Sequence, residues 1–137
     1  MSKKLNKIIL AVPALALALS TSAFATSYPH SDAATADKNT VKTRTVAYTC
    51  QAKKTVKVKY GFDKKNKPTY AQAKLNGKTR FMPINHHLTD IASTQFGDEN
   101  NFSLMADAMN YKNAHKASMS IQSPSSEILY KLCSPKK

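Results

Sequence analysis

The sequence predicts an all-β domain, either an antiparallel sandwich or a small barrel of about eight short strands. Two observations predict it. Apolar and polar residues alternate with period two in several short runs rich in Val, Tyr and Phe, which is the pattern of strands with one buried face. These runs recur roughly every 8–12 residues and are separated by turn-forming residues. A chain of 137 residues has room for one such domain.

The first 25 residues have the layout of a secretory signal peptide. Three lysines precede an apolar run over residues 8–19, and an Ala-x-Ala cleavage site ends at Ala25. The apolar run is too short for a transmembrane helix, which needs about 20 residues, and no cysteine follows it to take a lipid anchor. We therefore expect export through the Sec route to the periplasm or the outer-membrane surface, without a lipid anchor or an integral membrane segment.

Three segments follow from this pattern: a signal peptide (1–25), a leader (26–40) and a barrel domain (41–137). Residues 26–40 are small and polar without periodicity, so we expect them to be disordered.

Beyond residue 25 the chain keeps 18 of its 21 Lys and Arg residues and all 8 Asp and Glu residues, which gives a net charge of +10. Only 3 glycines are present, so Gly-rich phosphate loops are excluded, and with them most nucleotide-dependent enzymes.

The two cysteines, Cys50 and Cys133, lie in a chain addressed to an oxidising compartment. An even count there indicates one disulfide. It would close a loop of about 83 residues, for which the chain-entropy model gives roughly 4.5 kcal/mol. Two separate reactive thiols are the weaker interpretation, because neither cysteine has a Cys-x-x-Cys partner.

Regular structure is expected to begin near Val41. The first two runs with period-two alternation cover 45–50 and 55–62. A third run, over 70–75, leads into Asn76-Gly77, the strongest short hairpin signal because both residues tolerate a positive φ. The returning strand covers 78–82 and ends at a proline.

Strand signals in the second half of the chain are weaker. Three more strands are expected at 102–106, 117–122 and 127–133. A turn over 123–126 connects the last two of them. Two further segments, 88–96 and 107–115, are compatible with short helices, although neither has a clear cap or a sustained 3.6-residue period.

Charge is distributed unevenly along the chain. Residues 38–80 contain 13 Lys and Arg residues and one acid, Asp63. This basic region is either a set of solvated strand faces, in which lysines discourage edge pairing, or a surface for anionic glycans or lipopolysaccharide. Nucleic acid is not expected as a partner, because no recognition motif accompanies the charge. The lysines of the binding interpretation are Lys53, Lys54, Lys57, Lys59, Lys64, Lys65 and Lys67.

Residues 88–111 contain four acids and no Lys or Arg. This segment is either an ordinary loop that lacks lysine or a docking surface for a basic protein. A local negative patch orients a cationic partner even when the net charges repel, because screening limits the interaction to about 8 Å at physiological salt.

The sequence contains no strong pattern of catalytic or metal-binding residues. The four histidines lack the spacing of a metal site and no free thiolate joins them, so we expect neither a metal nor another cofactor. No nucleophile elbow is present and no carboxylate pair is marked for glycoside hydrolysis. We therefore do not expect an enzyme.

Six segments together carry a recognisable pattern: Thr45–Gln51, Lys54–Phe62, Thr69–Ala73, Leu75–Lys78, Met82–Asn85 and Tyr130–Pro135. The pattern resembles the adhesin complex protein family of Neisseria, which is related to the periplasmic and membrane-bound inhibitors of c-type lysozyme. The resemblance covers about residues 43–135. It implies a compact antiparallel β-barrel whose first and last strands are tied by the disulfide. It also implies inhibition of host c-type lysozyme, exposure at the outer membrane and a part in adhesion to host cells.

Inhibitors of the wider family insert a loop with a Ser-Gly-x-x-Tyr motif into the lysozyme cleft, and a later lysine assists. The corresponding stretch here, 93–97, keeps the serine and an aromatic residue but not the glycine, and residues 103–107 offer no lysine. We expect the stretch to approach the cleft while acids form a rim around the contact. The residues of this predicted site are Ser93, Thr94, Gln95, Phe96, Asp98, Glu99 and Asp107.

Two other interpretations remain open from the sequence. One is a surface adhesin or anionic-glycan binder that acts through the lysine-rich strands. The other is a structural periplasmic protein that kept the fold without the inhibition. The sequence also leaves the oligomeric state open, with a homodimer as one option.

Overall fold

The computed structural model describes residues 33–137, so the predicted signal peptide and residues 26–32 lie outside the described part of the chain. The elements in chain order are α2 (Ala33–Asn39), β1 (Lys42–Thr49), the 3-10 helix η1 (Gln51–Lys53), β2 (Thr55–Phe62), β3 (Pro68–Leu75), β4 (Lys78–Pro83), β5 (Ser93–Gly97), β6 (Ser103–Asp107), the 3-10 helix η2 (Ala114–Lys116), β7 (Met119–Gln122) and β8 (Ile128–Pro135).

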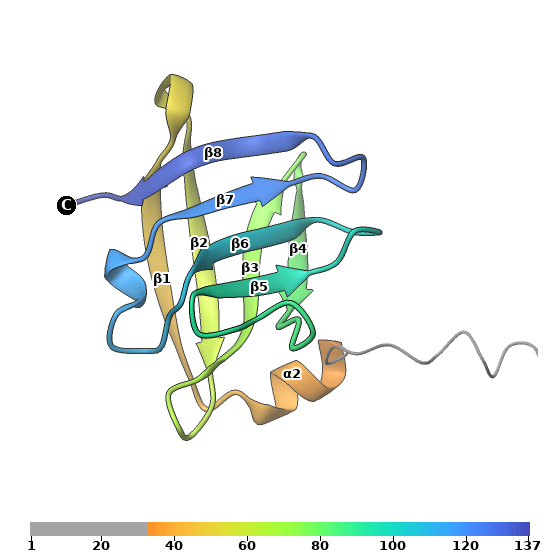
Figure 1. Cartoon of the computed structure of the whole chain (residues 1–137), viewed down its shortest axis with the longest axis vertical. Helices are drawn as coiled ribbons and strands as arrows, with labels where there is room; N and C mark the ends of the chain where they lie inside the picture. Colours follow the sequence, from red (N-terminus) through yellow and green to blue (C-terminus); the bar gives the residue numbers. More distant parts are fainter. Residues whose placement is uncertain (1–32) are drawn as a thin grey trace, which may run out of the picture.

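The eight strands form one antiparallel sheet in the order β4-β3-β2-β1-β8-β7-β6-β5. The sheet curls into a nearly closed barrel, in which β1–β4 cross β5–β8 (Figure 1). Two narrow seams join these halves. At one seam, Tyr48 and Thr49 of β1 pair with the end of β8; at the other, Ile84 forms a single bridge with Phe96 of β5. The predicted all-β barrel is confirmed.

Period-two alternation of the strands fills the barrel interior. In β2 the residues facing inward are buried while Lys57 and Lys59 between them are exposed. Because the inward side chains of both halves meet there, the barrel has one core. Its largest fully buried side chains are Tyr48, Tyr60, Phe62, Phe96, Leu75, Met82, Leu104 and Ile121.

The expected helices over 88–96 and 107–115 are wrong. Residues Ser93–Gly97 form β5, and residues 108–113 form turns before the 3-10 helix η2. In β5 the inward residues are Thr94 and Phe96, both buried. The alternation was difficult to recognise because one of the two buried residues is polar and the strand is only five residues long.

Residues 33–39 also depart from expectation, because they form the helix α2 instead of a disordered leader. The helix packs against β3 and β4 (Figure 1), and it buries Ala36 almost completely. A seven-residue helix is unstable alone, so this one depends on the barrel for its stability. Tertiary packing of this kind leaves little trace in sequence, since the buried residue is a single alanine.

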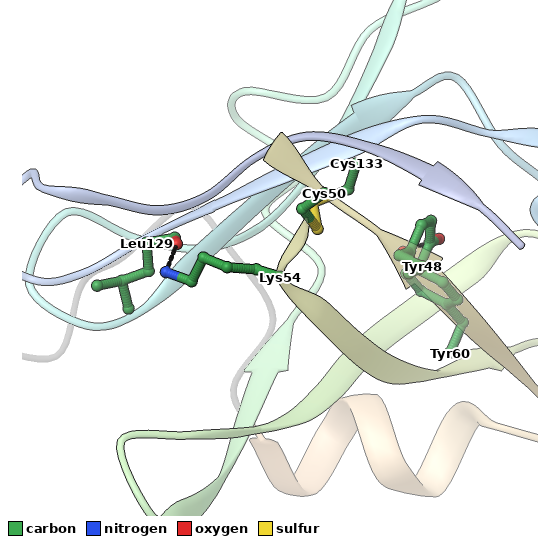
Figure 2. The surroundings of a disulfide bond; sticks show 6 residues. All are labelled: Tyr48, Cys50, Lys54, Tyr60, Leu129 and Cys133. Carbon is green, nitrogen blue, oxygen red and sulfur yellow. Dashed lines mark hydrogen bonds between the residues drawn. A yellow bond between two sulfur atoms is a disulfide. The ribbon is translucent and has the colours of Figure 1, made fainter. Parts of the chain in front are cut away.

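The Cys50–Cys133 disulfide forms as predicted and ties the end of β1 to β8 (Figure 2). Lys54 reinforces the same seam. Its ammonium group donates a hydrogen bond to the carbonyl of Leu129, at 2.5 Å, and lies 4.7 Å from the centre of the Tyr130 ring. The seam between β1 and β8 therefore has a disulfide and a cation–π contact in addition to its two paired residues, Tyr48 with Pro135 and Thr49 with Ser134.

Two tyrosine hydroxyls meet inside the barrel near this disulfide (Figure 2). The hydroxyls of Tyr48 and Tyr60 lie 2.6 Å apart, and both residues are fully buried. Burial raises the pKa of Tyr48 to about 12 and raises the pKa of Tyr60 well above its usual value. The pair is thus neutral at physiological pH and satisfies its polar atoms within an apolar core.

Candidate functional site

The connection between β4 and β5, residues 85–92, is held by the buried side chain of Asn85. Its amide nitrogen donates to the Gly97 carbonyl at 2.9 Å. Its carbonyl oxygen accepts the backbone N–H groups of His87 and Leu88, at 3.1 and 3.2 Å. One buried amide thereby anchors the start of the loop to the end of β5 and fixes its first turn.

The rest of the loop is fixed by Thr89 and Ala92. The Thr89 hydroxyl accepts the N–H of Gln95 at 3.0 Å and donates to the Gln95 carbonyl at 3.3 Å. The Ala108 N–H donates to the Ala92 carbonyl. The loop therefore has hydrogen bonds along its whole length, which is the property of a preorganised binding loop.

Asp90 closes a tight turn at the tip of this loop. Its carboxylate accepts the N–H groups of Ala92 and Ser93 at 2.8 and 2.9 Å. These two backbone hydrogen bonds hold the pKa of Asp90 below its usual value, so the carboxylate is charged at neutral pH. The next residue, Ile91, is 97% exposed. The turn thus presents a charged acid and a large apolar side chain side by side.

The outward side of the β5–β6 hairpin continues this surface. Ser93 pairs with Asp107, and Gln95 pairs with Met105. Met105 is half exposed and Asp107 is exposed. We call the combined set the loop surface, and it consists of Leu88, Asp90, Ile91, Ser93, Gln95, Met105 and Asp107.

The structure brings together only part of the predicted lysozyme site. Ser93, Gln95 and Asp107 lie on the loop surface. Thr94 and Phe96 point into the barrel instead, where the Thr94 hydroxyl accepts the Met109 N–H and Phe96 has no exposed surface. These two side chains belong to the core and not to the surface of the hairpin.

Asp98 and Glu99 occupy the turn between β5 and β6. Strands rise about 3.4 Å per residue, so this turn begins roughly 17 Å from Ser93 along the hairpin. The Asp98 carboxylate accepts hydrogen bonds from the Asn100 N–H and the Asn101 side chain. The predicted acids therefore flank the two ends of one hairpin and do not form a continuous rim.

The seven predicted lysines separate into three groups. Lys53 and Lys54 lie at or beside η1, and Lys57 and Lys59 project from the outer side of β2. The third group lies in the β2–β3 hairpin and consists of Lys64, Lys65 and Lys67. Since β2 has eight residues, the first and third groups lie about 25 Å apart.

Two apolar residues of the loop surface, Leu88 and Ile91, were missed at the sequence level. Both lie in the segment that was expected to be helical, where an apolar residue is normally buried. A signal was nevertheless present. The signal is weak and consists of Asp90 itself, because an Asp side chain can accept the backbone N–H two residues further on and so favours a turn.

Residues 33–137 contain no group of three His, Cys, Asp or Glu side chains that could hold a metal ion. In the same part of the chain, no helix is long and apolar enough to cross a membrane.

The fold and the loop surface define a small, disulfide-tied β-barrel with a hydrogen-bonded loop exposed at its surface. A family model described as an ACP-like domain matches residues 44–135. The structure of the Adhesin Complex Protein from Neisseria meningitidis is similar, with a TM-score of 0.66 and 39% sequence identity over 69% of this chain and 100% of that chain. The chain belongs to the adhesin complex protein family. No match was found among curated proteins.

Proposed function

We propose that this protein inhibits c-type lysozyme of the host by inserting the 85–92 loop into the active-site cleft of the enzyme. The observation that carries the proposal is the almost complete exposure of Ile91 at the tip of a loop whose backbone is fixed by hydrogen bonds. Inhibition by occlusion needs no catalytic group, since a rigid protrusion that fills a concave site is sufficient.

Rigidity of the loop favours tight binding. A flexible loop loses conformational entropy when it docks, and a preorganised loop avoids most of that cost. The bonds of Asn85 and Thr89 attach this loop directly to β5. We therefore expect the loop to enter the cleft with little change in backbone conformation.

The charge of the loop surface suits a basic enzyme. Lysozymes of the c-type are strongly basic, and Asp90 and Asp107 lie on either side of Ser93 in the structure. Their charges favour approach of a cationic partner in the correct orientation. Ile91 and Met105 supply the apolar contact area that stabilises the complex after encounter.

We further propose that the protein acts after export through the Sec route, in the periplasm or at the outer-membrane surface. The relative from Neisseria meningitidis is an adhesin complex protein by name, which supports attachment to host cell surfaces as a second function. The separate lysine groups on the other half of the barrel favour anionic glycans as the attachment partner.

The lysozyme proposal is tested with the disulfide-bonded protein from residue 26 onward, titrated against human c-type lysozyme in a cell-wall lysis assay. We expect saturable protection near stoichiometric inhibitor, and no effect on a goose-type lysozyme. Ile91→Ser should raise the inhibitor concentration for half-maximal protection at least tenfold. The control is Ile128→Ser, which makes the same substitution at a half-exposed isoleucine of β8 and should leave inhibition unchanged. Equal inhibition by both variants would exclude the 85–92 loop as the inserted element.

A further inference from the structure

A cleft of about 610 Å³ opens at the end of the barrel where α2 meets the β2–β3 hairpin. The described residues that line it come from α2, from the segment that enters β1, from the hairpin and from the end of β4. This volume lies within the range of small-ligand sites, about 300–1,000 Å³. The cleft is separate from the exposed tip of the loop surface, although His86 at the start of the 85–92 loop borders it.

Four lysines surround the cleft: Lys38, Lys64, Lys65 and Lys67. The one carboxylate among the described lining residues, Asp63, accepts the backbone N–H groups of Lys65 and Lys67 at 2.8 and 2.9 Å. Asp63 thus shapes the hairpin that carries the lysines. With four cations around one hollow, the cleft attracts anionic groups.

The walls between the lysines combine apolar and hydrogen-bonding groups. Val41, Pro68 and Ile84 supply apolar surface and Asn39 supplies an amide, while the buried Thr69 hydroxyl is already hydrogen-bonded to Thr40. A sugar ring has the matching chemistry, since its C–H faces pack on apolar side chains while its hydroxyls bond to amides. A lone phosphate or sulfate ion would use the lysines but leave most of the hollow empty.

We propose that this cleft binds an anionic oligosaccharide that carries sulfate or carboxylate groups. The anionic groups pair with the four lysines, and the rings occupy the space above Val41 and Pro68. The outward lysines of β2, Lys57 and Lys59, contribute only long-range attraction because they project from a strand outside the cleft. This inference rests on the surface-attachment part of the proposed function and does not depend on lysozyme inhibition.

The test measures binding of a heparin-derived hexasaccharide to the exported chain by calorimetry. A desulfated, N-acetylated form of the same hexasaccharide serves as the ligand control. Two single substitutions on the same stretch of chain make the matched pair: Val41→Glu places a negative charge in the cleft, and Thr45→Glu places the same charge on the outer side of β1, opposite Lys59. Neither substitution removes a backbone hydrogen bond, because each changes only the side chain. We expect Val41→Glu to weaken binding at least tenfold and Thr45→Glu to weaken it less than threefold.

A second matched pair removes positive charge. Lys64→Gln/Lys65→Gln/Lys67→Gln should abolish measurable binding, whereas the equally charged Lys57→Gln/Lys59→Gln/Lys74→Gln should lower affinity only a few-fold. Equal losses of affinity in the two triple variants would show that the glycan is held by diffuse charge attraction. That result would overturn the proposal that the cleft is the binding site. Stronger cleft-dependent binding to vesicles of phosphatidylglycerol than to the hexasaccharide would overturn the choice of a glycan.

The same variants distinguish this inference from the lysozyme proposal. The hairpin triple variant should inhibit c-type lysozyme at least as well as the parent protein, because it removes cations near the docking site of a basic enzyme. Loss of glycan binding with retained inhibition supports both proposals, and failure of either assay in the parent protein identifies which one is wrong.

Discussion

Strands β1–β4 and strands β5–β8 contribute to the same core but present different side chains to solvent. The outer side of β2 carries Lys57 and Lys59, whereas the outer side of the β5–β6 hairpin carries Ser93, Met105 and Asp107. The barrel keeps these charges apart, because the halves cross and meet only at two narrow seams (Figure 1). Under the two proposals above, a basic protein would dock on one half of the domain and an anionic glycan on the other.

Comparison of the seams with the strands around them indicates where the barrel is weakest. β1 pairs with β2 through eight residues, but with β8 through only two. The disulfide lies at this short seam. We infer that it secures the junction between the two halves more than either half internally.

Replacement of both cysteines, Cys50→Ala/Cys133→Ala, should therefore have the largest effect on the molecule. The cross-link spans 83 residues of sequence, so its loss should lower the free energy of unfolding by about 4.5 kcal/mol. Urea unfolding measures the loss. Hydrogen exchange should show β8 losing protection before β2 and β3 do. A loss below about 1 kcal/mol, or uniform exchange across the barrel, would contradict the weak-seam model.

The second prediction concerns the core, where the halves meet through Tyr60 of β2 and Phe96 of β5, with ring centres 5.6 Å apart. Tyr60→Phe leaves the buried Tyr48 hydroxyl without its partner, which should cost about 1–3 kcal/mol. The double variant Tyr48→Phe/Tyr60→Phe removes both hydroxyls and should be closer to the parent protein in stability. Thermal unfolding of the three proteins at pH 7 measures the coupling.

The same pair predicts the behaviour at alkaline pH. Both pKa values are raised in the folded state, so the contribution of this pair to stability is constant below about pH 10 and falls as the pH rises from about 10 through about 12. Each tyrosine contributes a slope of up to about 1.4 kcal/mol per pH unit in this window. The double phenylalanine variant should lose this part of the slope. An identical pH dependence in both proteins would exclude the buried pair as its cause.

The barrel and its disulfide were predictable because their signals are local and repeated. Alternation in β1–β3, the Asn76-Gly77 turn and an even cysteine count in an exported chain each indicate one structure. The helix α2 and strand β5 were not predictable in this way. Both are short, and their buried positions include Ala36 and Thr94, which are not the large apolar residues that sequence patterns depend on.

The candidate site was only partly predictable for a related reason. Sequence indicated that the 88–107 region is acidic, and two of its four acids, Asp90 and Asp107, lie beside the exposed loop. It did not indicate which side chains face outward, because that depends on the register of β5 with β6. In the observed register Gln95 faces outward and Phe96 faces the core. A shift of one residue would place Phe96 at the surface and Gln95 in the core. The role of Ile91 depends likewise on the Asp90 turn, which became clear only from the fold.

The smallest predicted effect tests whether the lysines of β2 and the acids of the β5–β6 hairpin act in opposite directions on association. Glu99→Lys in the β5–β6 turn should slow association with c-type lysozyme two- to fivefold at low salt, while Lys57→Glu on β2 should speed it by a smaller factor. Dissociation rates should stay unchanged in both variants, because neither residue belongs to the loop surface. Surface plasmon resonance at 20 and 150 mM salt measures both rates. Both effects should shrink at the higher salt, where screening limits interactions to about 8 Å. If both variants changed the association rate in the same direction, the separation of charge between the halves would have no part in recognition.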